Sequence, residues 1–229
     1  HFAHALKASA PGSVGIPSGV EVVSKVVDLD AAAVRAWAKC TRKEQSAVRA
    51  LTGSHYGRIN SSLRSGAVEP EVTPLDSAFG ARLPRYVGMI GRGHSNIADL
   101  PGGWSTIEKW SKGESATWEN AGYTHASPYP ERVWDKSFKV FIRSKGLHPG
   151  GYVDPVSSNR GEKEHIVGRG FKGRVSAVGW NKSKTRAFIV VDEPDDISAL
   201  PSRQDPPRQV EYDEVMAEWK REMQSGNVP

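Results

Sequence analysis

The order of hydrophobic patterns along the chain limits the fold more than any other feature. Residues 28–63 repeat apolar side chains at intervals of three and four, which predicts three short helices. From about residue 86 the pattern changes to short apolar runs bounded by Gly, Pro and Asn, which predict strands; the clearest are Tyr86–Ile90, Phe138–Ile142 and Ala187–Val191. Because no long helical segments alternate with these runs, we expect an α+β protein rather than a doubly wound parallel sheet.

Local signals indicate where the helices begin. Asp30 is expected to cap the first helix. Thr41 is expected to cap the second, because Glu44 three residues later completes a capping-box pattern. A further short helix is expected near Ile107, and an amphipathic helix over residues 212–223, after a Pro-rich stretch. Helices should therefore stand at both ends of the strand region.

Composition excludes few classes of protein. A chain of 229 residues, 38% hydrophobic and 25% charged, can form one large globular domain or two small ones. No apolar run approaches the roughly 18 to 20 residues that a membrane-spanning helix needs, so we expect no span. Residues 1–19 lack the basic start and apolar segment of a signal peptide. The net charge of +5 is a mild excess, which favours a solvated surface over a nucleic-acid site.

Cysteine and histidine usage argues against a metal site. Cys40 is the single cysteine, which excludes an internal disulfide and any multi-cysteine metal site, and its helical surroundings favour a packed thiol. The histidines show no metal-ligand spacing. His1 and His4 could chelate at the chain end, but we assign no metal to them.

Three short motifs carry candidate functional side chains. Glu162-Lys163-Glu164 precedes the apolar run 165–167, and on a strand the period of two would place both carboxylates on one face. Gly91-Arg92-Gly93 follows a predicted strand, so an arginine, which binds phosphate bidentately, stands beside glycines that allow close backbone approach. The third motif is the small, polar stretch 122–127. Each motif alone is more typical of a solvated surface or a turn than of an active site.

Taken in order, these motifs resemble the arginine-serine-glutamate class of mono-ADP-ribosyltransferases, which includes clostridial binary toxins, bacterial effectors and phage-encoded enzymes. Residues 51–64 look like the family's helical signature of Tyr, Ile-Asn and Leu-Arg. Gly91-Arg92-Gly93 resembles its strand-borne Arg-Gly, and Gly122-Tyr123 stands where the family has Gly-Phe. Glu162-Lys163-Glu164 followed by residues 168–172 looks like the family's Glu-x-Glu strand and its Arg-Gly exit.

The resemblance covers roughly residues 45–192 and implies a fold and a substrate. The fold would be an N-terminal helical layer packed on two antiparallel β-sheets that form a cleft for NAD, without a metal. Arg92 would hold an NAD phosphate, while the backbone around Gly93 contacts the nicotinamide amide. Glu164 would be the central catalytic carboxylate, stabilising the positive charge on the ribose as nicotinamide leaves.

The resemblance also assigns residues to the acceptor. In the family, a glutamate at the place of Glu162 accompanies arginine as acceptor, and a carboxylate is needed there because a guanidinium is protonated at neutral pH. We therefore expect an arginine target. Ser158 and Arg160, in the family's recognition turn, are expected to touch the acceptor, and the turn lacks the aromatic residue of actin-directed toxins. For stacking on nicotinamide, Trp134 is preferred among the aromatic residues of segment 128–141.

One departure from the family's pattern affects the catalytic motif. His125-Ala126-Ser127 stands where the family has Ser-Thr-Ser, so histidine replaces the serine that braces the catalytic glutamate. An imidazole can still donate a hydrogen bond, and we expect Gly122, His125 and Ser127 all to contact NAD.

We expect three regions. Residues 1–27 would be an N-terminal extension, residues 28–195 the catalytic domain with its helical layer (28–80) and β core (81–195), and residues 196–229 a Pro-rich segment with a C-terminal helix. The expected partner is a target protein that presents an arginine, with no membrane partner. The site of action would be the cytoplasm of the cell in which it works, reached if necessary as a secreted effector or toxin or with a phage particle.

Two alternatives stay open. An enzyme of the same fold could act on nucleic acid, for which the basic balance of charge is weak support. The second alternative is a non-catalytic module that binds NAD or a partner. It is supported by His125 and Ala126, which depart from the family's motif.

Overall fold

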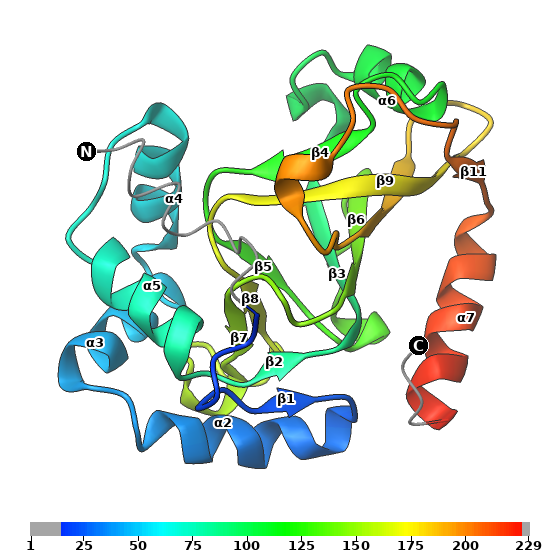
Figure 1. Ribbon diagram of the computed structural model, residues 1–229. Helices are drawn as coiled ribbons and strands as arrows, with labels where there is room; N and C mark the ends of the chain where they lie inside the picture. The colour runs from blue at the N-terminus through cyan, green and yellow to red at the C-terminus, as the bar shows by residue number, and fades with distance from the viewer. Residues whose placement is uncertain (1–14, 226–229) are drawn as a thin grey trace.

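The N-terminal periodicity produces a layer of helices. A computed structural model describes residues 15–225 and places four α-helices beside two larger β-sheets (Figure 1). The helices are α2 (Leu29–Trp37), α3 (Arg42–Leu51), α4 (Tyr56–Ser65) and α5 (Val72–Ala81). The first three confirm the sequence prediction. The pattern does not reveal α5 because Pro74 and Gly80 interrupt it, although a proline is tolerated in the first turn of a helix.

Of the two expected helix caps, one is confirmed and one is wrong. The capping box at α3 is confirmed: Thr41 Oγ1 accepts a hydrogen bond from the backbone N–H of Glu44, and the Glu44 carboxylate accepts one from the backbone N–H of Thr41. The cap at Asp30 is wrong, because the 3-10 helix η1 (Val26–Asp28) runs directly into α2 and leaves Asp30 inside the first turn. Its carboxylate instead accepts a hydrogen bond from the Tyr152 hydroxyl at 3.0 Å, which ties α2 to the β-structure.

The main sheet has the strand order β11-β9-β10-β6-β3, with β4 also paired to β9. Its strands are β3 (Gly88–Ser95), β4 (Thr117–Asn120), β6 (Phe138–Ser144), β9 (Phe171–Trp180), β10 (Ala187–Asp192) and β11 (Arg208–Gln209). The apolar runs predicted as strands are confirmed in β3, β6 and β10. The sheet is mixed rather than wholly antiparallel, because β10 runs parallel to β6 and β11 to β9. Between β6 and β10 the chain passes through residues 150–152 and 165–167, which are strands of the second sheet, and through β9. Such a long crossover permits parallel pairing.

The second sheet is antiparallel and joins the first at one point. Its order is β5-β8-β7, from β5 (Thr124–Ala126), β7 (Gly150–Tyr152) and β8 (His165–Val167). Gly91 of β3 and Ser127, just after β5, exchange two backbone hydrogen bonds of 2.9 Å. A Cβ at position 91 would lie 2.9 Å from the Phe141 ring, so glycine lets this ring pack against β3. The bridge sets Arg92 beside the segment that carries His125.

Shorter elements complete the chain. A two-stranded parallel sheet joins β1 (Val22–Val23) to β2 (Arg85–Tyr86). The remaining helices are η2 (Ile97–Asp99), α6 (Trp104–Ser111), η3 (Pro130–Arg132), η4 (Asp154–Val156), η5 (Ile197–Ala199) and α7 (Tyr212–Ser225). The short helix expected near Ile107 and the C-terminal amphipathic helix are thus confirmed as α6 and α7. No helix in this described part of the chain is long and apolar enough to cross a membrane.

Three buried clusters hold these layers together. One lies between the main sheet, the second sheet and α6, another fills the helical layer up to Tyr123 and Ile166, and the third lies between the main sheet and α7. In the third, the fully buried Trp219 of α7 meets Phe141 of β6 edge to face, with ring centroids 5.9 Å apart. The C-terminal segment is therefore packed on the sheet.

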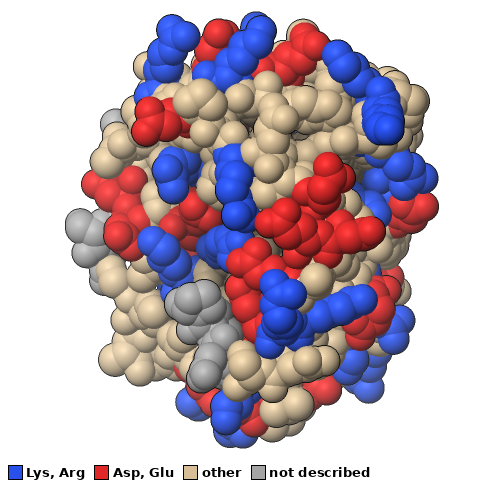
Figure 2. Space-filling view, turned by 90° about the vertical axis from the view of Figure 1, so that its right-hand side faces the viewer, with Lys and Arg blue, Asp and Glu red and all other residues tan. Residues whose placement is uncertain are grey.

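The face of the molecule that carries α7 presents basic and acidic side chains together (Figure 2). Arg143 of β6, for example, pairs with Glu218 and Glu222 of α7. This face offers no continuous basic surface of the kind that nucleic acids favour.

Replacement of Trp219 tests the packing of α7. Trp219→Ala should lower the free energy of unfolding by about 3 to 5 kcal/mol, because it removes a fully buried indole and leaves a cavity. Urea unfolding measures the change. The neighbouring, exposed Lys220→Ala is the control and should stay within roughly 0.5 kcal/mol of the wild type. A loss below about 1 kcal/mol for Trp219→Ala would mean that α7 does not pack on the sheet in solution.

Candidate functional site

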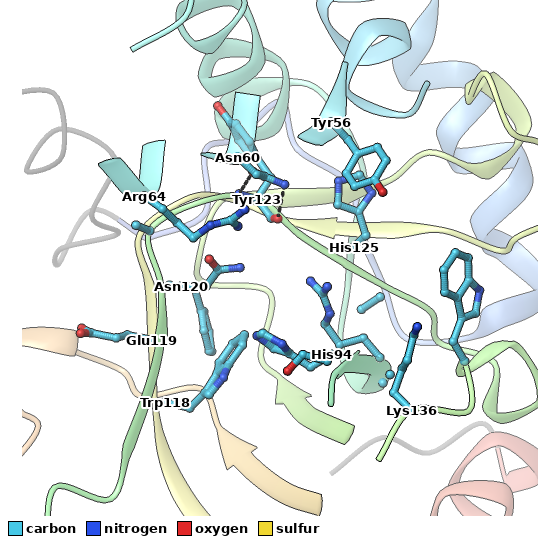
Figure 3. Close-up of a pocket in the computed structure, with 18 of the residues that line it drawn as sticks. Tyr56, Asn60, Arg64, His94, Trp118, Glu119, Asn120, Tyr123, His125 and Lys136 are labelled. Atoms are coloured by element: carbon cyan, nitrogen blue, oxygen red, sulfur yellow. Dashed lines mark hydrogen bonds between the residues drawn. The ribbon is translucent and has the colours of Figure 1, made fainter. Parts of the chain in front are cut away.

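A cleft of about 1110 Å³ opens between the helical layer and the two sheets (Figure 3). Its walls come from α4, β3, α6, β4, β5, the loop before β6 and the turn before β8. Most of the residues singled out from the sequence line it: Arg92, Gly93, His125, Ser127, Trp134, Glu162 and Glu164. Segments far apart in the chain therefore meet in one cavity, which is slightly larger than the roughly 300 to 1,000 Å³ of usual ligand sites.

The turn that carries the two glutamates is not a strand. Strand β8 begins only at His165, and Lys163 takes a left-handed backbone conformation with φ of 54°. The strand expectation for residues 162–164 is therefore wrong, since an extended backbone cannot include that conformation. Both glutamates nevertheless line the cleft, while the Lys163 side chain pairs with Asp30 at 3.4 Å. The bend, and not the strand period, brings the carboxylates to the cleft.

Glu164 is a buried carboxylate with fixed partners. Its Oε1 lies 2.5 Å from His125 Nδ1, and its Oε2 accepts a hydrogen bond of 3.4 Å from Ser157 Oγ. Its side chain is 6% exposed. Because a carboxylate accepts, His125 Nδ1 must carry the hydrogen in this contact. The ring of His125 in turn meets the Tyr56 ring edge-on, with centroids 5.7 Å apart. Histidine thus provides a brace for Glu164 where the family's pattern has serine.

Glu162 is the more exposed of the two carboxylates. Partial burial and the neighbouring charge of Glu164 raise the pKa of its carboxyl group. Two acidic groups in one cleft disfavour ionising both, so Glu162 takes up a proton more readily than an ordinary glutamate.

Positive charge gathers on the wall formed by β3 and α4. No carboxylate within residues 15–225 forms an ion pair with Arg92 or Arg64, and the buried Nε of Arg92 has no hydrogen-bond partner there. Burial and the charge of Arg64 lower the pKa of Arg92 to about 10, so it stays protonated at neutral pH. Burial and both arginines lower the pKa of His94 to about 4, so it is neutral. Two uncompensated guanidinium groups suit an anionic ligand such as a phosphate.

Close backbone contacts shape the wall beside Arg92. A Cβ on Gly93 would lie 2.1 Å from the Trp134 carbonyl oxygen, so only glycine lets β3 approach this loop. Trp134 itself is 64% exposed at the cleft. Ser127 Oγ donates to the Lys163 carbonyl at 2.8 Å and so fastens the end of β5 to the glutamate turn.

Three of the expected residues do not line the cleft. Gly122 packs against Asn60, where a Cβ would lie 2.5 Å from the amide oxygen. Ser158 donates through Oγ to the Arg49 carbonyl at 2.8 Å, so its hydroxyl is engaged with the end of α3. Arg160 is exposed on the turn outside the cavity.

Sequence reasoning gave no site role to several residues of the cleft. Tyr56, Asn60 and Arg64 lie four residues apart on α4, which sets them on one helix face toward the cleft (Figure 3). Asn60 bonds both the N–H and the carbonyl of Tyr123, at 2.8 and 3.2 Å, and so ties α4 to the start of β5. His94 follows Arg92 by two residues on β3. These spacings could have identified the residues; Trp118, which faces His94 edge-on at 5.7 Å, gave no such signal.

No group of three His, Cys, Asp or Glu side chains in the region from residue 15 to residue 225 could hold a metal ion. His1 and His4 lie outside the described residues.

Comparison with known proteins identifies the fold. No protein-family model and no curated protein matches the sequence. Solved structures do match. The Clostridium limosum C3 exoenzyme has a TM-score of 0.60 at 17% identity, over 76% of this chain and 97% of that one. C3stau2 from S. aureus, solved with NAD, has a TM-score of 0.56 at 14% identity, over 77% of this chain and 98% of that one. Plx2a, an ADP-ribosyltransferase toxin from Paenibacillus larvae, has a TM-score of 0.57 at 17% identity, over 71% of this chain and 90% of that one. The chain thus has the ADP-ribosyltransferase fold, which confirms the expected fold class.

The charge cluster predicts a titration that can be measured. His94 should titrate near pH 4, and Arg92→Gln should raise its pKa, because the lost positive charge no longer opposes the imidazolium. The value should remain below about 6.5, since burial persists. NMR titration of labelled histidine measures the shift. Arg42→Gln, on the exposed surface of α3, is the control. If His94 has the same pKa in both variants, the charge of Arg92 does not act on His94.

Proposed function

We propose that the protein is an NAD-dependent mono-ADP-ribosyltransferase, which transfers ADP-ribose from NAD to an arginine side chain of a target protein and releases nicotinamide. The observation that carries the proposal is the buried Glu164 carboxylate, braced by His125, in the same cleft as the unpaired Arg92 and Arg64. The shared fold supports it, as does the NAD in the similar structure of C3stau2.

The arrangement of charges fits NAD as the substrate. The dinucleotide carries negative charge on its pyrophosphate, and Arg92 with Arg64 would hold it as fork-shaped donors. Gly93 lets β3 lie against the loop that carries Trp134, and the exposed Trp134 ring would stack on nicotinamide. The neutral His94 adds a polar group without further charge. We assign no metal to the reaction.

Glu164 would act on the ribose. When the bond to nicotinamide breaks, positive charge develops on the ribose carbon, and a fixed carboxylate stabilises that charge. Glu164 is suited to this role because His125 and Ser157 hold its two oxygens in place before NAD binds. No reorganisation is then needed at the moment of reaction.

Glu162 would act on the acceptor. An arginine guanidinium is protonated at neutral pH, so it can attack only when a carboxylate positions it and takes up a proton. Glu162 is exposed at the cleft, and its raised pKa makes it a better proton acceptor than an ordinary glutamate. Arg160, exposed on the same turn, would face the target protein, whereas the Ser158 hydroxyl is engaged with α3. We propose that this target lies in the cytoplasm of a cell that the protein enters as a toxin, effector or phage-delivered protein, in line with the description of Plx2a as a toxin.

Two glutamate variants test the assignment. With NAD and agmatine, a free-arginine mimic, the wild type should release nicotinamide and form ADP-ribosyl-agmatine. Glu164→Ala should lower both by roughly 10²- to 10³-fold or more, because it removes stabilisation of the ribose charge. Glu162→Ala should lower transfer by roughly 10²- to 10⁴-fold while NAD hydrolysis continues within a few fold.

The same assay separates the alternatives. NAD binding without nicotinamide release would identify a non-catalytic module, and label transferred to an oligonucleotide instead of agmatine would identify an enzyme of nucleic acids. Equal losses of hydrolysis in both glutamate variants would contradict the division of roles.

The pKa of Glu162 predicts how transfer depends on pH. A raised pKa means that Glu162 becomes protonated, and so loses its function, at a higher pH than an ordinary glutamate. The rate of transfer to agmatine should therefore fall on the acid side with a midpoint above about 4.3. The pH profile of transfer measures this midpoint, and NAD hydrolysis by Glu162→Gln, which lacks the titrating group, should not show the same acid limb. An acid limb that persists unchanged in that variant would assign it to another group.

A further inference from the structure

The carboxylate of Asp154 lies directly beneath the turn that carries the two glutamates. Asp154 begins η4 and is 4% exposed, so a charged group is buried at a place where no step of the proposed reaction needs one. Burial of a carboxylate is unfavourable unless it is paired or hydrogen-bonded. Its partners indicate what it does.

We propose that Asp154 is a positioning residue that fixes Glu162 for the acceptor arginine, an inference that rests on the proposed function. Asp154 Oδ1 accepts hydrogen bonds from the backbone N–H of Gly161 at 2.9 Å and of Lys163 at 2.7 Å. These two N–H groups belong to the residues on either side of Glu162. One carboxylate oxygen thus holds the chain before and after the glutamate, which restricts the direction of its side chain.

The second oxygen of Asp154 helps to fix the turn through its contact with Lys163. Lys163 Nζ lies 3.8 Å from Asp154 Oδ2 and 3.4 Å from Asp30, and 5.8 Å from the centre of the Tyr129 ring. These contacts hold the lysine away from the cleft and stabilise its left-handed backbone, which lysine rarely adopts without such support. With Lys163 fixed in this way, Glu162 before it is turned toward the cleft.

The two glutamates have separate supports. Glu164 is held by His125 and Ser157 through its side chain, and its carbonyl accepts the N–H of Val153 at 3.0 Å. None of these contacts involves the Asp154 carboxylate. Loss of that carboxylate should therefore disturb Glu162, and transfer to the acceptor, more than Glu164 and the cleavage of NAD.

Variants of Asp154 test this selectivity. Asp154→Ala should lower transfer to agmatine by roughly 10- to 100-fold, which is the usual effect of removing a supporting group. The rate of NAD hydrolysis measured without an acceptor should stay within about threefold of the wild-type rate. Asp154→Asn should keep transfer within about fivefold, because its amide oxygen can accept both N–H groups. In the Glu162→Ala background, Asp154→Ala should cause no further loss of transfer, because a residue that acts through Glu162 has nothing left to position.

Amide hydrogen exchange tests the contact without relying on activity. The N–H groups of Gly161 and Lys163 should exchange slowly in the wild type and in Asp154→Asn, and at least tenfold faster in Asp154→Ala. Arg160, whose N–H has no acceptor among residues 15–225, is the internal reference. If Asp154→Ala does not fold, fast exchange at both positions in the folded wild type or Asp154→Asn would still overturn the proposal.

The outcomes distinguish failure of the proposed function from failure of the role proposed for Asp154. A wild type that neither releases nicotinamide nor modifies agmatine removes the proposed function, whatever the exchange rates show. With an active wild type, equal losses of hydrolysis and transfer in Asp154→Ala, or a further loss on the Glu162→Ala background, would overturn the positioning role and leave the proposed function standing.

Discussion

The pair of backbone hydrogen bonds between Gly91 and Ser127 is the contact on which the rest of the site depends. It joins the two sheets where β3 passes the end of β5, so the strand that carries Arg92 lies beside the strand that carries His125. Ser127 then reaches with its hydroxyl to the carbonyl of Lys163. Three distant parts of the sequence therefore converge through these backbone and side-chain hydrogen bonds.

The cleft gathers groups that would be more stable apart. Burial and the charge of Arg64 lower the pKa of Arg92, and burial and the charge of Glu164 raise the pKa of Glu162. Such arrangements weaken the fold and are typical of sites built for a ligand or a reaction. The core clusters around Tyr123 and Trp219 supply the packing that keeps these charges close. The layers thus supply the stability, and the cavity between them holds the charged groups.

Prediction from the sequence succeeded where a local pattern determines structure. The capping box of Thr41 and Glu44 spans four residues, and the apolar runs of β6 and β10 mark strands whichever strands they pair with. Asp30 does not cap α2 because η1 runs directly into that helix, and its carboxylate binds Tyr152, which lies 122 residues away in the sequence. The strand assigned to residues 162–164 was wrong because the contacts of Lys163 and Asp154 impose a bend that propensity does not encode.

The sequence by itself determined the order of helices and strands, the identity of the two glutamates and the Arg-Gly motif, because these depend on neighbouring residues and on the order of motifs. Only the tertiary structure decided that His125 braces Glu164, that Arg64 joins Arg92, and that Ser158 faces α3 rather than the cleft. Each of these depends on backbone approaches between segments remote in sequence. Hydrogen bonds and charges act over a few ångströms in space, whereas a sequence pattern reports separation along the chain alone.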